Sequence, residues 1–336
     1  MERRFRLIGG VRYTWEQKSV EGVNGRINFP WDRFPVSNPP GTVLDIGGKR
    51  TDKAVNFRAG FEFDIAPASM LYANISTGFK AGGFFADIRP NEYKPEHLTA
   101  YQAGIKNRFF DNRLQLNVEG FYWDYKDKQQ SYLSITNSGG IGARTDNAGK
   151  ATLYGADFSI VALVTKNDTV SADLSYNHTR YDEFQYTTAQ LGPSAPLTEC
   201  AIGPVEPGVP FPRRTIDCSG FPLVRAPKWS GRVGWQHSAT LNDGSKLELD
   251  VTTQFSSSYY LNNDFTAYEK TDFYHTTDLT LSWTSAGRGV AITGFVKNLE
   301  DKAVYTGGSQ TPALPGYVLA TIRAPRTFGG RIRFSF

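Results

Sequence analysis

The sequence predicts an all-β fold: an antiparallel, up-and-down transmembrane β-barrel wall of about twelve strands. Three observations predict it. Apolar and polar residues alternate along many segments, the connections between these segments alternate between short and long, and aromatic residues make up 14% of the 336 residues. Aromatic residues favour strands. A strict period of two indicates strands with one apolar and one polar face.

The period of two is clearest in the segment 57–65. Phe57, Phe61 and Phe63 fall on one face, and charged residues fall on the other. The same division recurs in 114–119, 170–177, 247–254 and 328–336. Many of these segments exceed the usual strand length of about five or six residues. A tilted strand needs about 9–11 residues to cross a membrane, which suits these lengths.

The connections between the predicted strands are more informative than the strands. Short turns rich in Asn, Asp, Gly and Pro are predicted at 66–67, 111–112, 167–168, 242–244 and 287–289. Long connections are predicted between them, at about 19–52, 81–97, 128–148, 185–225, 257–273 and 305–318. Membrane barrels have short periplasmic turns and long extracellular loops, so this alternation favours a membrane barrel over a soluble sandwich.

Composition excludes several classes of protein. No run of 18 apolar residues is present, so a transmembrane helix is not expected. The formal net charge of +4 gives no footprint for nucleic acid. The basic start from Met1 to Arg6 lacks the apolar region of a signal peptide.

The two cysteines, Cys200 and Cys218, lie in one Pro-rich stretch, the long connection 185–225. In an oxidising compartment a disulfide between them is expected, and it would stabilise that loop by about 3 kcal/mol. The alternative is two unrelated free thiols.

Several segments, in order, resemble the C-terminal barrel of TonB-dependent outer-membrane receptors. The stretch Asn74–Phe84 resembles "S-x-G-F-K-x-G-G-F", and Lys94–Lys106 resembles "K-P-E-x-x-x-x-Y-E-x-G-x-K", with Gln102 in place of the usual acidic residue. Asn147–Ala156 resembles "N-A-G-K-A-x-x-x-G". Further similar segments are 111–127, 226–229, 297–301 and 325–330. The resemblance covers nearly the whole chain, 1–336.

This resemblance implies the last twelve strands of a 22-strand barrel. The family also has an N-terminal plug domain and a TonB-binding segment, and neither is recognisable here. We therefore interpret the chain as a C-terminal fragment whose Met1 lies inside a longer reading frame. An open sheet leaves unpaired edges, which are unfavourable in lipid. The alternative is that the twelve strands close on themselves.

The resemblance also implies roles for particular residues. Phe328, Ile332, Phe334 and the final Phe336 fit the outer-membrane assembly signal that the barrel assembly machinery reads. Charges on the polar faces are expected to line the lumen, where they could contact a plug or a passing ligand: Arg58, Glu62, Asp64, Glu119, Lys297, Arg331 and Arg333. Aromatic residues near strand ends fit either a membrane girdle or ordinary packing: Trp15, Tyr122, Trp123, Tyr125, Trp229, Trp235 and Trp283.

No catalytic, metal or cofactor pattern stands out. The four histidines are far apart, and the Gly-rich stretch 139–142 lacks the strand–turn–helix context of a phosphate loop. We therefore expect a receptor barrel, not an enzyme, in the outer membrane of a Gram-negative bacterium. Its expected partners are outer-membrane lipid, the assembly machinery, the TonB complex through the missing N-terminal region, and a scarce nutrient. A ferric siderophore is the first expectation; the alternatives are cobalamin, an oligosaccharide, or a passive porin-like channel.

Overall fold

A computed structural model describes residues 4–25, 43–87, 91–135, 141–147, 149–190, 193–208, 212–310 and 318–335. Its main element is a 12-stranded antiparallel sheet. The strands of this sheet, in spatial order, are β1 (Phe5–Val20), β4 (Gly48–Ala66), β5 (Ser69–Lys80), β8 (Glu96–Phe109), β9 (Leu114–Lys126), β12 (Lys150–Leu163), β13 (Asp168–Glu183), β17 (Trp229–Thr240), β18 (Lys246–Ser256), β19 (Tyr274–Thr284), β20 (Val290–Lys297) and β23 (Thr327–Phe334).

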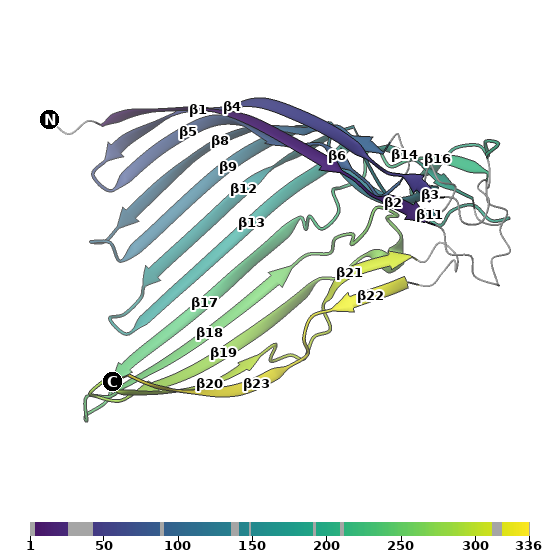
Figure 1. Ribbon diagram of the computed structural model, residues 1–336. Helices are drawn as coiled ribbons and strands as arrows, with labels where there is room; N and C mark the ends of the chain where they lie inside the picture. Colours follow the sequence, from purple (N-terminus) through teal and green to yellow (C-terminus); the bar gives the residue numbers. More distant parts are fainter. Residues whose placement is uncertain are drawn as a thin grey trace.

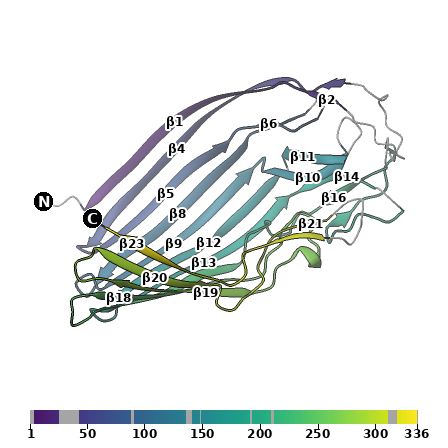
Figure 2. The ribbon, with the colours of Figure 1, turned by 60° about the horizontal axis from the view of Figure 1, so that its bottom comes forward.

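The spatial order of these strands follows their order along the chain, which makes the sheet an up-and-down meander. The sheet curves into a trough, with β1 along one rim and β23 along the other (Figures 1 and 2). In the described part of the chain β1 and β23 do not pair with each other, so the sheet is open. The predicted fold class is confirmed: an all-β, antiparallel meander of twelve strands.

Short turns join the strands at one end of the trough, where β1 begins and β23 ends (Figure 1). The turn between β8 and β9 places Asp111 and Asn112 at φ 53° and 66°, in the left-handed region that Asp and Asn tolerate. Gly244 has φ 82° in the turn between β17 and β18. These turn residues, predicted from the sequence, therefore lie at positions where the backbone adopts a positive φ.

The long connections gather at the opposite end and contain small sheets of their own (Figure 1). Four of these connections match the prediction closely. The elements within the long connections are β2 (Val23–Gly25), β3 (Val43–Asp45), β6 (Gly83–Phe84), β7 (Glu92–Tyr93), β10 (Gln129–Ile135), β11 (Ile141–Asn147), β14 (Gln185–Ala189), β15 (Ala201–Ile202), β16 (Arg213–Asp217), a 3₁₀ turn η1 (Ala267–Glu269), β21 (Tyr305–Gln310) and β22 (Val318–Ile322).

The first and last connections differ from their predicted bounds. The predicted loop 19–52 is shorter, because polar residues such as Arg50 continue β4 by pairing with Lys18 and its neighbours on β1. The predicted loop 305–318 is longer and spans 298–326. Asn298, the residue after β20, has φ 51°, and its side-chain oxygen accepts a hydrogen bond from the backbone N–H of Lys302 at 3.0 Å. The chain therefore leaves the sheet earlier than the sequence pattern indicated.

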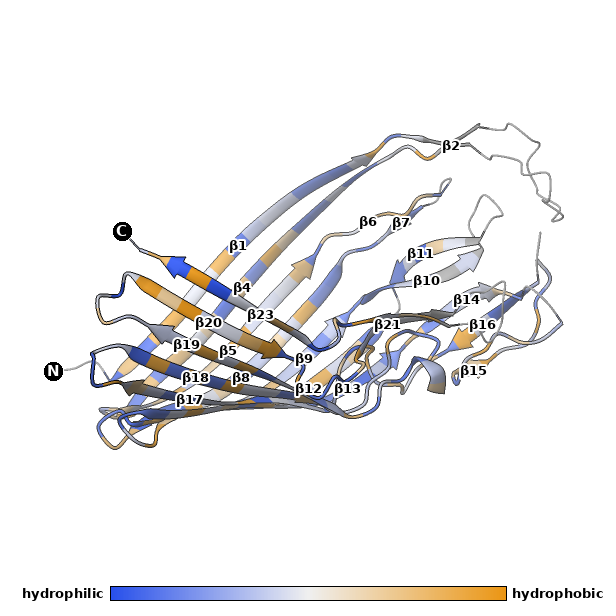
Figure 3. Cartoon of the chain, turned by 90° about the horizontal axis from the view of Figure 1, so that it is seen from below, coloured by the Kyte–Doolittle hydropathy of each residue, from blue (hydrophilic) through white to orange (hydrophobic). Residues whose placement is uncertain are grey.

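In this sheet the polar residues are the more buried and the apolar residues the more exposed, which is the reverse of the pattern in a soluble protein. Along β4 the polar residues Asp52, Glu62 and Asp64 are buried or half-buried. The apolar residues Val55 and Phe57 are 65% and 40% exposed. Figure 3 shows the same alternation of hydrophilic and hydrophobic residues along the other strands. An exposed apolar face of this extent needs an apolar environment to cover it.

Within the described residues, no helix has the length and apolar character to cross a bilayer.

Candidate functional site

The polar face of the sheet carries a continuous row of side chains. Glu62 pairs with Tyr72, Tyr72 with Gly104, Gly104 with Glu119, and Glu119 with Asp157. Directly paired residues on antiparallel strands point to the same side, so these residues form one level of the wall. Gly104 is necessary here, because a Cβ at that position would lie 2.6 Å from the Tyr72 hydroxyl. The space it leaves lets the Tyr72 hydroxyl donate to the Glu119 carboxylate across β8.

At one end of this row Arg6 of β1 neutralises two carboxylates of β4. Its Nε donates to Glu62 at 2.9 Å, and its two terminal nitrogens donate to Asp64 at 2.6 and 2.7 Å. This two-pronged contact is the strong geometry for an arginine and a carboxylate. The edge strand is thereby held to its neighbour by charge as well as by the backbone.

Farther along the row, Glu119 and Asp157 face each other across β9 and β12. Glu119 accepts from Tyr72 and from Gln102 at 2.8 Å, and Asp157 accepts from Ser175. In the described part of the chain neither carboxylate forms an ion pair with a cation. Like charges directly opposite each other destabilise a sheet. This carboxylate pair is therefore suited to receive a cationic group from outside the sheet.

The predicted lumen charges all fall on this polar face. Register places Arg58, Glu62 and Asp64 of β4 on the same side as Glu119 of β9. The remaining pairings place Lys297, Arg331 and Arg333 on that side too. Arg58 and the cations of β20 and β23 form no ion pair with a described residue. The structure thus brings these residues to one face, but not into one cluster.

The residues of the predicted assembly signal lie on the other, apolar face. Phe328, Ile332 and Phe334 are 82%, 61% and 61% exposed there. Phe336 lies outside the described residues. Strand register also assigns a face to each aromatic residue for which the sequence left girdle or packing open. Trp123 and Tyr125 lie on the polar face, and the others lie on the apolar face: Trp15, Tyr122, Trp229, Trp235 and Trp283.

Three of the long connections, 128–148, 185–225 and 257–273, pack into one body, the loop cluster, built around the disulfide Cys200–Cys218. Its Cα atoms are 4.8 Å apart, and both cysteines are buried beside Phe184, Ile216 and Phe265. The backbone carbonyl of Asp264 accepts the Thr198 hydroxyl at 2.7 Å, which ties the disulfide loop to the connection between β18 and β19.

Within the loop cluster, the hairpin β10–β11 contacts the disulfide connection and the connection between β18 and β19. The Ser134 hydroxyl donates to the carbonyl of Thr187 at 2.6 Å, and Asn263 donates to the carbonyl of Ser131 at 2.9 Å. The ring of Tyr132 lies 4.6 Å from that of Tyr186 on β14. The hairpin thus joins its own long connection to two others and fixes their relative positions.

A polar pocket of about 610 Å³ opens where the connections 81–97, 128–148 and 185–225 meet. Its walls come from β7, the hairpin β10–β11, β14 and β16. Arg144 pairs with Asp146 at 2.7 Å and lies over the Phe85 ring, and the Tyr132 hydroxyl donates to Asp146. The residues that line this loop pocket are Glu92, Tyr93, Lys94, Asp127, Tyr132, Ser134, Arg144, Asp146, Asn147, Gln185, Tyr186, Thr187, Thr188 and Arg213.

Burial shifts the pKa values of several ionisable groups in and near the loop cluster. Burial, reinforced by the hydrogen bond to Asp146, raises the pKa of Tyr132 and keeps its hydroxyl protonated. Burial also raises the pKa of Asp264 to about 7, and the nearby Glu269 carboxylate adds to the effect. Burial lowers the pKa of Lys128. The loop cluster therefore contains groups whose charge is sensitive to their packing.

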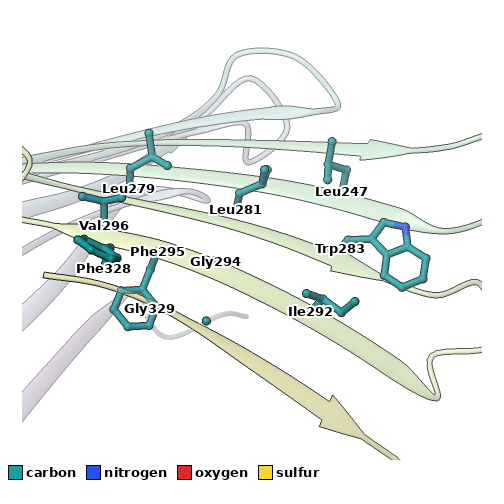
Figure 4. A pocket seen from close by; sticks show the side chains of 11 residues that line it. Leu247, Leu279, Leu281, Trp283, Ile292, Gly294, Phe295, Val296, Phe328 and Gly329 are labelled. Carbon is teal, nitrogen blue, oxygen red and sulfur yellow. The ribbon is translucent and has the colours of Figure 1, made fainter.

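A second hollow, of about 700 Å³, has a different character (Figure 4). It is lined by Leu279, Leu281, Ile292 and Phe328 around the cross-strand pair of Gly294 and Gly330. These residues belong to the exposed apolar face, which lacks the polar groups that orient a solute. We therefore do not assign it as the solute site. Among the described residues no group of three or more His, Cys, Asp or Glu could hold a metal ion.

The loop pocket was not predicted from the sequence. Its residues lie in four separate segments between Glu92 and Arg213, with no motif that connects them. The one available signal was the pair of cysteines, which marked the connection that supplies Tyr186 and Arg213.

Together, an open meander with an exposed apolar face and an enclosed polar face defines the wall of a membrane β-barrel. Residues 1–299 match the family model of the TonB dependent receptor-like β-barrel. The chain belongs to this family, as its motifs indicated.

Relatives and solved structures agree with this assignment. The ferric-pyoverdine M114 receptor PbuA of Pseudomonas sp. strain M114 is 23% identical over 282 residues, which are 76% of this chain and 31% of PbuA. The metal-pseudopaline receptor CntO of Pseudomonas aeruginosa strain UCBPP-PA14 is 28% identical over 126 residues, which are 38% of this chain and 17% of CntO.

The ferric yersiniabactin uptake receptor FyuA from Yersinia pestis has a similar fold, with a TM-score of 0.73 and 16% identity. The match covers 99% of this chain and 43% of FyuA. The chain thus spans about a third of PbuA and less than half of FyuA.

Proposed function

We propose that this chain forms part of the wall, and the extracellular loops, of an outer-membrane receptor for TonB-energised uptake of a metal chelate. An iron–siderophore complex is the first candidate ligand, because relatives of the chain are named as receptors for ferric pyoverdine and for metal-pseudopaline. The wall would be incomplete alone, as a C-terminal portion of a larger barrel. The observation that carries the proposal is the combination of an enclosed polar face with a polar pocket in the loop cluster.

The two faces of the sheet support a position in a bilayer. The apolar face would meet outer-membrane lipid, and the row of exposed Phe328, Ile332 and Phe334 on β23 would be read by the assembly machinery. The polar face would then line the lumen. The long connections, with the disulfide loop 185–225 among them, would lie on the extracellular side, because long loops and short turns occupy opposite ends of the sheet.

The carboxylates of Glu119 and Asp157 supply a contact for the lumen. A guanidinium or ammonium group from a plug domain or from a passing ligand would offset their mutual repulsion. Energy from TonB would act through the plug, so the residues of this chain would hold and release but would perform no covalent chemistry.

A passive channel is the rival function. It requires a closed wall, whereas β1 and β23 remain unpaired edges in the described sheet. The two functions differ in conductance: a receptor wall without its remaining strands would not form a stable pore in a planar bilayer, and a passive porin would.

Chelate binding tests the proposal directly. The chain, folded in detergent with its disulfide intact, is titrated with Fe(III) chelates of carboxylate, catecholate and hydroxamate type while tryptophan fluorescence is recorded. We expect saturable quenching by at least one chelate and none by cobalamin or an oligosaccharide of similar size. Stable ion conductance without any chelate binding would instead support the passive channel.

A further inference from the structure

We propose that the loop pocket selects a chelate of net negative charge, and that Lys94 and Arg213 bind its carboxylate, catecholate or phosphate oxygens. This inference rests on the proposed function, since it names the ligand class of the same pocket. It goes further by assigning the selection to two side chains from different loops.

Some of the charges in the loop pocket are already engaged within the protein. Arg144 holds Asp146 through two contacts, at 2.7 and 3.4 Å. Glu92 pairs with Arg50 at 3.3 Å. These groups would have to give up a partner in order to bind a ligand, so they shape the pocket more than they bind.

The remaining charges are not engaged with other described residues. The side chains of Lys94 and Arg213 are exposed and form no hydrogen bond or ion pair within the described part of the chain, and the Asp127 carboxylate forms none there either. The described lining of the pocket therefore contains two unengaged cations and one unengaged anion. The pocket has a surplus of cationic groups for a ligand to neutralise.

Both cations start from backbone positions that are firmly held. The N–H of Lys94 donates to the Asn147 side chain at 2.7 Å, and Asn147 donates back to the Lys94 carbonyl at 2.9 Å. Arg213 exchanges backbone hydrogen bonds with Glu206 at 2.8 and 2.9 Å. A free cationic side chain on a fixed backbone loses little entropy when it binds, compared with one on a moving loop.

Two hydroxyls of the loop pocket already donate their protons within the protein. The Tyr132 hydroxyl is committed to Asp146 and the Ser134 hydroxyl to the carbonyl of Thr187. With these two protons in use, the unengaged charged groups among the described lining residues are the carboxylate of Asp127 and, in excess over it, the N–H groups of Lys94 and Arg213. Such groups bind oxygen anions through charge-assisted hydrogen bonds.

The test compares two Fe(III) chelates of opposite charge on four variants of the detergent-folded chain. The probes are Fe(III)–citrate, which is anionic, and a trihydroxamate Fe(III) chelate with a cationic amine. The variants are Lys94→Gln, Arg213→Gln, Asp127→Asn and Lys166→Gln. Lys166 lies in a short turn at the opposite end of the sheet, so its variant is the matched control for a lost lysine charge. Circular dichroism and disulfide content verify the fold of each.

We expect Lys94→Gln and Arg213→Gln each to weaken binding of Fe(III)–citrate roughly tenfold, the loss of one charge-assisted contact. Asp127→Asn should tighten it, and Lys166→Gln should leave it unchanged. The wild-type chain should prefer the anionic chelate, and this preference should shrink as salt rises.

Failure of the inference and failure of the proposed function give different results. If the chain binds a chelate but prefers the cationic one, or if Lys94→Gln and Arg213→Gln bind Fe(III)–citrate as well as wild type does, the charge selection is wrong and the receptor function stands. If neither of these chelates nor a catecholate chelate binds to the folded chain, both are overturned.

Discussion

The carboxylates of Glu119 and Asp157 occupy directly opposite positions on β9 and β12, on the polar face of the sheet. Glu119 accepts from Tyr72 and Gln102, and Asp157 accepts from Ser175, but the described residues place no cation within ion-pair distance of either carboxylate. A sheet does not need such a pair for its own stability. The pair is therefore available to a cationic group from outside the described sheet, as the proposed function requires.

Replacement of Asp157 by Asn should stabilise the isolated chain. The Ser175 hydroxyl can still donate to the amide oxygen, and the repulsion from Glu119 disappears, which is worth about 0.5 kcal/mol. The measurement is the urea midpoint of unfolding in detergent. Asp173→Asn serves as control, because Asp173 already faces Arg232 at 3.2 Å and should gain nothing. A lower midpoint for the Asp157 variant would show that the pair is not repulsive.

Loss of the disulfide should open the loop cluster and spare the sheet. The double variant Cys200→Ser, Cys218→Ser removes a cross-link worth about 3 kcal/mol over its sequence separation of 18 residues. Trypsin should then cleave faster at Arg213 and Arg214, while cleavage at Lys166 in the opposite turn keeps its rate. Reduced wild type should behave like the double variant. Equal cleavage of all three forms at Arg213 would contradict the role of the disulfide in the loop cluster.

Protonation of Asp264 should make the loop cluster tighter at acidic pH. Burial and the carboxylate of Glu269 raise the pKa of Asp264 from 3.8 to about 7 in the folded state, and Tyr186 is its hydrogen-bonding neighbour. Between these values the folded state holds a proton that the unfolded state has lost. The stabilisation is thus complete below pH ~3.8 and decreases as pH rises towards 7, by roughly 1.4 kcal/mol per unit.

Hydrogen exchange of residues 257–273 measures this dependence. Protection should fall as pH rises from 4 to 7 once the intrinsic exchange rate is corrected for, and Asp264→Asn should remove most of the slope. Asp243→Asn, in a short turn, is the control and should leave the slope of this loop unchanged. Protection that is independent of pH in the wild type would contradict a raised pKa for Asp264.

The sequence predicted the sheet because the two faces of a membrane strand have opposite requirements. Residues such as Phe61 and Glu62 must alternate wherever lipid and water meet across one strand, so the period of two survives without tertiary information. The ends of strands were less predictable. Arg50 and Asp52 continue β4 beyond its apolar stretch, and there the polar sequence resembles a loop.

The loop pocket could not be predicted because folding, not sequence spacing, assembles it. Lys94 and Arg213 are far apart along the chain and meet the same cavity only through the hairpin β10–β11. Each residue alone resembles an ordinary solvated side chain. The row from Glu62 to Asp157 was partly anticipated, since Glu62 and Glu119 were expected on one face. Asp157 was not predicted, and its pairing with Glu119 required the register of the strands.

Residue-by-residue labelling of β18 tests most directly whether this sheet is a membrane wall. Single cysteines from 247 to 252, in the Cys200→Ser, Cys218→Ser background, carry a spin label in lipid vesicles, and collision with oxygen is compared with collision with a water-soluble nickel chelate. We predict oxygen access at Leu247, Leu249 and Val251, and nickel access at Glu248, Asp250 and Thr252. Nickel access at all positions, or no period of two, would contradict the account.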